Sequence, residues 1–159
     1  MNRISFLLPV HRLFAAGSVI SLAGMIAAVV IQVFSRFFLD AAPHWTEEAA
    51  RIFFIYSVAF GTGTGIARGD FIRLDLIGKH LSPQNERVLH IFTESAVILF
   101  SVILIIYSLD FVRLGMDEKS PALQVSMGLV FFSMVIIGMA IFIFTLESLY
   151  RYLRELKRK

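Results

Sequence analysis

The sequence has no cysteine and little charge, and each shortage excludes a class of protein. Without cysteine the chain forms no disulfide framework, no thiolate metal site and no cysteine nucleophile. Charged residues make up 17% of its 159 residues, well under the ~25% of typical soluble domains. Apolar residues make up 57%, and the mean hydropathy is +0.76. This charge is too little to cover so much apolar side chain in water, so we predict a single membrane domain, residues 1–159.

Proline is also scarce, with four in the chain and none inside the long apolar runs. A membrane helix needs roughly 20 apolar residues, and four runs approach or exceed that length. Two Ser-Pro pairs, at 82–83 and 120–121, predict the starts of the third and fourth helices. We expect an all-α integral membrane protein with four transmembrane helices and short interfacial amphipathic segments. The predicted spans are residues 13–34, 46–67, 88–109 and 122–147.

Positive charge is unevenly distributed among the loops between these spans. Eleven Lys and Arg residues lie on the side of the two termini and the second loop, and four lie on the opposite side. The positive-inside rule therefore places both termini in the cytoplasm, with the first span uncleaved. Residues 70–81 alternate apolar and charged side chains, which predicts an amphipathic segment in the cytoplasmic interface. The basic tail favours anionic membrane lipids, and we expect no nucleic-acid partner.

The stretch FGTGTGIARGD contains a cluster of glycines. A phosphate-binding loop would need a strand before the glycines and a helix after them, whereas these glycines end an apolar helix. Gly61, Gly65 and Gly69 are spaced four apart, so they share one face of that helix. Small residues at this spacing allow two membrane helices to approach closely. We therefore expect helix packing and no nucleotide binding.

His90 and Glu94 lie four residues apart within the third span. Ionisable groups inside a membrane suggest a proton relay or an ion site, while the structural alternative is a hydrogen-bonded pair against a neighbouring helix. A metal site needs a third ligand, and haem needs axial histidines at matching depth. Only His90 of the four histidines lies inside a predicted span. We therefore expect no cofactor, and both roles for the pair stay open.

The segment WTEEAARIFFIY places charge at the start of the second apolar run. Glu47 and Glu48 are adjacent, so on a helix they point about 100° apart and do not face one substrate as a catalytic pair. Both suit the first helical turn, where the helix dipole favours negative charge. Glu47 and Arg51 have favourable i, i+4 spacing, and Trp45 suits the aromatic belt at the membrane border. We predict an interfacial helix start with Thr46 as its N-cap.

The segments RFFLDAAPHWTEEAARIFF and ARGDFIRLDLI, in this order within four spans, resemble the small membrane subunit of tripartite ATP-independent periplasmic (TRAP) transporters, the DctQ-like family. The resemblance covers nearly the whole chain. In that family an Arg-aromatic pair ends the first span, a Trp-x-Glu-Glu-x-x-Arg-like segment opens the second, and an Arg-Gly-acid-His-Ile-Arg-Val-Asp-like segment closes it. Phe71 departs from the pattern, because the family usually has His there. The matching positions are Arg36, Phe37, Trp45, Glu47, Glu48, Arg51, Arg68, Gly69, Asp70, Ile72, Arg73, Asp75, Pro83 and Arg87.

The resemblance implies a function that depends on partners. In the family a large membrane subunit moves substrate by an elevator-like motion driven by a sodium or proton gradient. A soluble periplasmic protein delivers the substrate, usually an organic acid such as a C4-dicarboxylate or sialic acid. The small subunit binds the large one in the bacterial inner membrane and serves as a fixed scaffold, without catalytic, cofactor or metal sites. The residues expected at interface or structural positions are Arg36, Trp45, Glu47, Glu48, Arg51, Gly61, Gly65, Gly69, Arg73 and Asp75.

Two other functions remain open for the sequence. One is a self-sufficient small dimeric transporter that uses Glu94 as its coupling carboxylate. The other is a membrane enzyme or redox subunit, which would need a cofactor such as haem or quinone. The resemblance favours a non-enzymatic transporter subunit over both.

Overall fold

The computed structural model describes residues 8–38, 43–68 and 83–156, which form four long helices and one ordered loop. Each helix is long and apolar enough to cross a membrane, and the described residues contain no named strand. The predicted fold class is therefore confirmed, while the predicted amphipathic segment 70–81 lies outside the described residues. The helices are α1 (Leu8–Phe38), α2 (His44–Arg68), α4 (Pro83–Met116) and α5 (Met127–Leu156).

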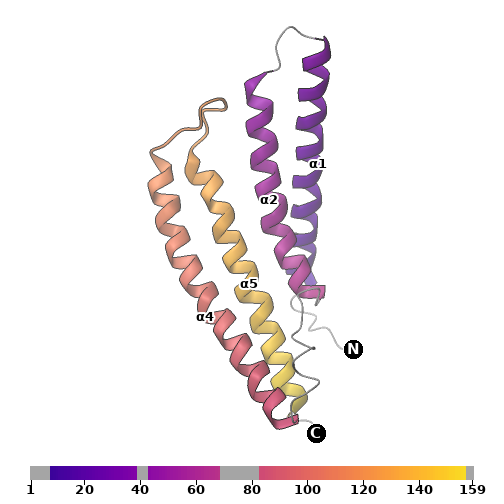
Figure 1. The fold of residues 1–159 in the computed structure, drawn as a ribbon, viewed down its shortest axis with the longest axis vertical. Coiled ribbons are helices and arrows are strands. Elements are labelled where there is room, and N and C mark those ends of the chain that lie inside the picture. The colour runs from indigo at the N-terminus through magenta and orange to yellow at the C-terminus, as the bar shows by residue number, and fades with distance from the viewer. Residues whose placement is uncertain (1–7, 39–42, 69–82, 157–159) are drawn as a thin grey trace.

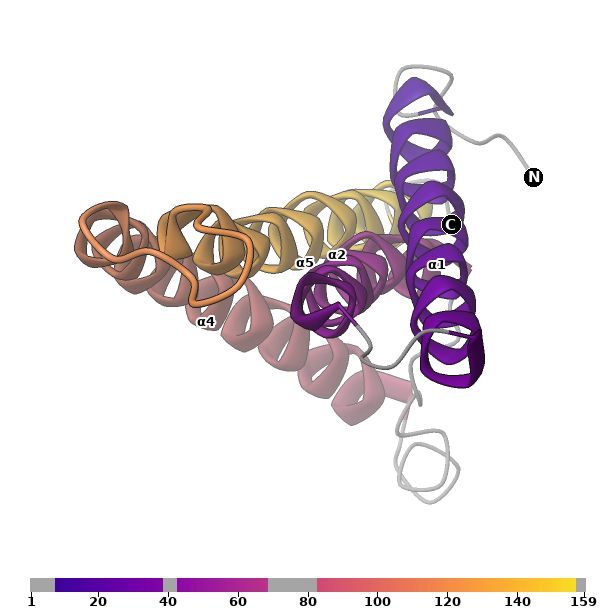
Figure 2. The same ribbon diagram turned by 90° about the horizontal axis from the view of Figure 1, so that it is seen from above.

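The four helices form two antiparallel hairpins that meet along one seam (Figure 1). Helix α1 packs on α2 and α4 packs on α5, and contacts between α2 and α5 join the two pairs. Seen from above, α2 and α5 lie between α1 and α4, so the two outer helices sit at opposite edges (Figure 2). The arrangement is thus an open row of helices, which leaves much apolar surface on α1 and α4 to face lipid or a partner.

The buried face of each outer helix is a narrow stripe of mostly small residues. In α1 the buried residues Phe14, Ser21, Ala28 and Ser35 are spaced seven apart. A seven-residue repeat keeps one seam facing a neighbouring helix, as in a left-handed coiled coil. Small side chains on the stripe allow the backbones to approach closely. The other faces of these helices are apolar and exposed. The helices therefore have a high mean hydropathy although few of their residues are buried.

Glycines on α1 and α2 make room for aromatic rings at the helix contacts. A Cβ atom at Gly17 would lie 2.8 Å from the ring of Phe60. A Cβ atom at Gly63 would lie 2.5 Å from Phe14 and 2.7 Å from Phe144. Phe14 and Phe144 come from α1 and α5, so the backbone of Gly63 lies against rings from both neighbours of α2. On α2, the glycine against which rings of both neighbouring helices pack is Gly63. This position lies outside the predicted Gly61–Gly65–Gly69 stripe.

The loop between α4 and α5, residues 117–126, replaces a helix start that the sequence predicts. The prediction that Ser120 and Pro121 begin the fourth helix is wrong, because α5 begins at Met127. The backbone N–H of Ser120 donates to the carbonyl of Val125 at 2.8 Å, which closes a turn. Gln124 completes this turn with a φ of 55°, in the left-handed region. A Ser-Pro pair signals a turn as well as a helix start, and here the turn forms.

The hydrogen bonds at two helix starts differ from those that the sequence predicts. The Ser126 hydroxyl accepts the backbone N–H of Gly128 at 3.2 Å and so caps α5. Thr46 is not the N-cap of α2, which begins two residues earlier at His44. Its fully buried hydroxyl donates to the carbonyl oxygen of Pro43 at 2.7 Å. The Thr46 hydroxyl therefore donates a hydrogen bond across the first helical turn. An N-cap side chain would instead accept a hydrogen bond from a backbone N–H.

Candidate functional site

Polar contacts join the two hairpins at three levels of their seam. At the loop end, where α2 begins and the α4–α5 loop lies, Glu48 of α2 binds that loop. Further along the seam, the Tyr56 hydroxyl donates to the backbone carbonyl of Leu129 in α5 at 2.6 Å. At the terminal end, where α1 begins and α5 ends, His11 of α1 contacts Glu147 of α5. These contacts hold the open row of helices at both ends and between them.

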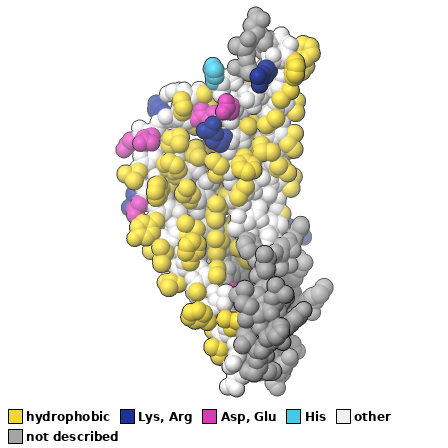
Figure 3. All heavy atoms as spheres, in the orientation of Figure 1, with side chains coloured by type: hydrophobic (Ala, Val, Ile, Leu, Met, Phe, Trp, Pro, Cys, Tyr) yellow, Lys and Arg dark blue, Asp and Glu magenta, His cyan; other side chains and the backbone are white. Residues whose placement is uncertain are grey.

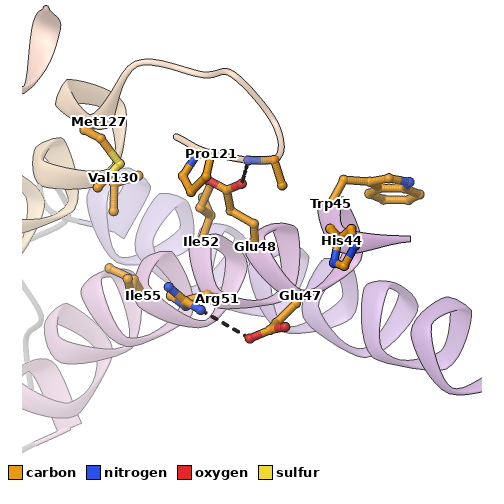
Figure 4. A pocket seen from close by; sticks show the side chains of 11 residues that line it. His44, Trp45, Glu47, Glu48, Arg51, Ile52, Ile55, Pro121, Met127 and Val130 are labelled. Atoms are coloured by element: carbon orange, nitrogen blue, oxygen red, sulfur yellow. Dashed lines mark hydrogen bonds and ion pairs between the residues drawn. The ribbon is translucent and has the colours of Figure 1, made fainter. Parts of the chain in front are cut away.

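The adjacent carboxylates Glu47 and Glu48 have separate partners, as their helical spacing predicts. Glu48 accepts the backbone N–H groups of Ala122 and Leu123, each at 2.9 Å. Glu47 points the other way and pairs with Arg51 at 3.4 Å (Figure 4). The predicted Glu47–Arg51 pair is therefore present. The carboxylate of Glu48 forms hydrogen bonds within the chain, whereas the side chains of Glu47 and Arg51 face outward.

A groove of about 660 Å³ opens beside these charges, between α2, the start of α5 and the α4–α5 loop. Glu47 and Arg51 are on its polar side, with side chains 68% and 66% exposed. Its apolar lining consists mainly of Ile52 and Ile55 from α2 together with Met127 and Val130 from α5 (Figure 4). Trp45, predicted for the membrane border, also lines it and is 42% exposed. The space-filling view shows acidic and basic side chains gathered toward the loop end, above a mostly hydrophobic face (Figure 3).

A buried carboxylate stands at the terminal end of the seam. The side chain of Glu147 in α5 is 5% exposed, and its Oε2 atom lies 3.3 Å from Nε2 of His11. Its Oε1 atom lies 3.9 Å from Nε of Arg151, one turn further along α5. The ring of His11 also packs on Phe144, with 4.7 Å between ring centroids. A buried charge needs such partners, so His11 and Arg151 together make the burial of Glu147 possible.

The predicted pair His90–Glu94 lies on α4 and contacts α5, the other helix of its hairpin. The Ser148 hydroxyl donates to Oε1 of Glu94 at 2.9 Å, whereas Nε2 of His90 is 3.9 Å from that oxygen, too far for a hydrogen bond. His90 instead stacks on Tyr152, with 4.1 Å between ring centroids. No group of three or more His, Asp or Glu among residues 8–38, 43–68 and 83–156 is arranged to hold a metal ion. Within the chain, the pair thus packs against a neighbouring helix.

The remaining predicted positions are dispersed along the structure. Arg36 is exposed in the last turn of α1. Gly61 and Gly65 are half-buried on α2, and a Cβ atom at Gly61 would meet Ser18 at an ordinary 3.6 Å. Gly69, Arg73 and Asp75 lie outside the described residues, so the role of the glycine stripe stays a prediction.

Sequence reasoning missed the residues that join α1 to α5 and α2 to α5. His11 precedes the first predicted span, but α1 begins at Leu8 and includes it. Glu147 and Arg151 have i, i+4 spacing, a signal that marks Glu147 as a candidate ion-pair residue. Tyr56 carries no local signal, because its partner is 73 residues away in sequence.

The fold and this site define a class: a four-span membrane protein whose buried and half-buried carboxylates in the described helices are bound within the chain. Residues 25–155 match the family model of the tripartite ATP-independent periplasmic transporters, DctQ component. The chain belongs to this family and is the small membrane subunit of a TRAP transporter. It is therefore a multi-pass protein of the bacterial inner membrane.

A relative from Haemophilus influenzae is similar over most of both chains. It is assigned as a TRAP transporter small permease protein and is 23% identical over 138 residues. The match covers 87% of this chain and 84% of the relative. The similarity thus extends over all four helices and is not confined to one motif.

Proposed function

We propose that the chain is an accessory scaffold that binds the large membrane subunit of its transporter. In this role it supports uptake of an organic acid, of the C4-dicarboxylate or sialic acid type, driven by a sodium or proton gradient. A periplasmic binding protein delivers the substrate, and the coupling ion binds in the large subunit. The observation that carries the proposal is the hairpin seam, in which the chain uses its buried polar groups to fix its own helices.

The carboxylates that are bound within the chain support a scaffold over a transporter that works alone. A transport site needs ionisable groups near the bilayer midplane that can exchange partners, and it is often built from broken helices. Here each helix is continuous over its described range. Glu48, Glu94 and Glu147 each have partners within the chain. A scaffold needs carboxylates that are held within the chain in this way, while its lipid-facing sides stay free for a partner.

The orientation follows from the charge distribution. With both termini in the cytoplasm, the loop end of the seam faces the periplasm and the terminal end faces the cytoplasm. The anionic lipids of the cytoplasmic leaflet then meet the basic tail. On this basis the α4–α5 loop is presented on the side where the binding protein works. The chain itself acts without a cofactor and is not an enzyme.

Reconstitution of the full chain into proteoliposomes tests the proposal against a self-sufficient transporter. We expect no gradient-driven uptake of labelled C4-dicarboxylates or sialic acid by the chain alone. Uptake is expected once the large subunit and the binding protein are added, and Glu94→Gln should keep most of it, because Ser148 can still bind the amide. Uptake by the chain alone that Glu94→Gln abolishes would contradict the scaffold function.

A further inference from the structure

The groove at the loop end carries an exposed pair of opposite charges, Glu47 and Arg51, above an apolar floor. We propose that it binds phosphatidylethanolamine, a zwitterionic phospholipid with a primary ammonium group. The headgroup lies between Glu47 and Arg51, and one acyl chain follows the floor formed by Ile52, Ile55, Met127 and Val130. This inference does not depend on the proposed function, because it concerns a surface of the chain itself.

The two rim charges are available to an external ligand. Their side chains are about two-thirds exposed, and their mutual contact is a single one at 3.4 Å. Exposed pairs of this kind add little stability, so they exchange partners at low cost. The carboxylate of Glu47 can accept from an ammonium group, and the guanidinium of Arg51 can donate two hydrogen bonds to a phosphate.

The balance of charge at the rim selects a zwitterionic headgroup over an anionic one. Glu48 also lines the groove, but its carboxylate accepts two backbone N–H groups of the loop. Both N–H groups bind its Oε2 atom, so the loop holds the carboxylate in place and keeps its negative charge beside Arg51. A purely anionic headgroup would meet two carboxylates, Glu47 and Glu48, and one guanidinium, Arg51, in the groove lining that the structure describes. An ethanolamine headgroup supplies a cation for Glu47 and an anion for Arg51.

The size and depth of the groove also fit a lipid. Its volume of about 660 Å³ lies within the ~300–1,000 Å³ of small-molecule sites. A transmembrane helix, ~30 Å long and ~10–12 Å across, has a volume several times larger than this. Trp45 at the rim belongs to the headgroup level of the membrane, so the charges lie where a lipid phosphate lies. Ile52 and Ile55 follow Trp45 by about two to three helical turns along α2, so the apolar floor lies on the hydrocarbon side of the rim (Figure 4).

The test measures which phospholipid stays bound to the full chain, together with any subunit that co-purifies, in mild detergent. After exchange against equal amounts of phosphatidylethanolamine, phosphatidylcholine and phosphatidylglycerol, mass spectrometry gives the bound lipid per protein. We expect the ethanolamine lipid to exceed each of the others by roughly tenfold, since phosphatidylcholine lacks N–H donors for Glu47.

Two rim variants and one matched control make the test specific. Glu47→Arg leaves a doubly basic rim and should shift retention to phosphatidylglycerol, while Glu47→Gln should lower ethanolamine selectivity roughly threefold. Asp110→Arg is the control, because Asp110 pairs with Arg113 at 3.3 Å near the same end and lines no part of the groove. The control should keep the wild-type lipid profile. Equal retention of all three lipids by the wild type, or the same change in the control as in Glu47→Arg, would overturn the proposal.

Discussion

The carboxylate of Glu48 accepts the backbone N–H of Leu123, 75 residues further along the chain, at 2.9 Å. The same oxygen accepts the N–H of Ala122, so one side chain of α2 holds the turn that joins α4 to α5. The loop has its own turn bonds, but the N–H groups of Ala122 and Leu123 find their acceptor on the neighbouring hairpin. The shape of the loop at this end therefore depends on the neighbouring hairpin.

Replacing Glu48 by Ala should loosen the α4–α5 loop without unfolding the helices. The loop would lose its acceptor for Ala122 and Leu123, and such unpaired N–H groups exchange readily with solvent. Hydrogen exchange followed by mass spectrometry should show faster exchange over residues 117–126, with the centre of α5 unchanged. Glu47→Ala is the matched control, and it should leave loop exchange as in the wild type. Equal protection in both variants would contradict the role given to Glu48.

A methyl group at Gly63 should destabilise the contact of α2 with α1 and α5. The added Cβ would lie 2.5 Å from Phe14 and 2.7 Å from Phe144, so two rings must move. Overpacking of this kind costs about 1–3 kcal/mol. The measurement is the free energy of unfolding of Gly63→Ala in mixed micelles. Gly61→Ala, whose Cβ has an ordinary contact at 3.6 Å, should show no loss and gain up to about 1 kcal/mol, because Ala favours a helix interior over Gly.

Loss of the His11 side chain should weaken the attachment of α1 to α5. His11→Ala removes the nearer of the two charged partners that buried Glu147 has among the described residues and leaves Arg151 at 3.9 Å, so we expect a loss of about 1–3 kcal/mol. His11→Gln keeps a donor and should recover part of this loss. Unfolding in mixed micelles gives the values, with the exposed neighbour Arg12→Ala as control. A loss from Arg12→Ala as large as that from His11→Ala would show that charge at the helix start matters and not the contact with Glu147.

Exchange of Glu47 and Arg51 for each other should disturb assembly less than Arg51→Glu alone. The double variant keeps an i, i+4 pair of opposite charges, although in the less favourable order. Arg51→Glu instead places three carboxylates within two turns of α2. The yield of large subunit that co-purifies with each variant is the measurement. Equal losses in the two variants would mean that one of these side chains contacts the partner directly.

The helices and the local ion pairs were predictable, because their signals lie within a few residues. Long apolar runs bounded by charge define the spans, and i, i+4 spacing predicts the Glu47–Arg51 pair. The partners of Glu48 and Tyr56 could not be predicted, since contacts between distant segments leave no local pattern. The prediction of a helix start at Ser120–Pro121 was wrong because a Ser-Pro pair is typical of both a helix start and a turn. His11 was missed because a polar residue near a helix end lowers hydropathy without ending the helix.

Association of this chain with a large membrane subunit decides whether the chain is a scaffold. The tagged full chain is purified from native membranes in mild detergent, and co-purifying proteins are identified and quantified by mass spectrometry. A scaffold should bring down one large multi-span TRAP permease in a fixed ratio to the chain, retained through size-exclusion chromatography. Recovery of the chain alone or as a self-associated dimer, with no large permease from membranes that contain one, would contradict the scaffold function.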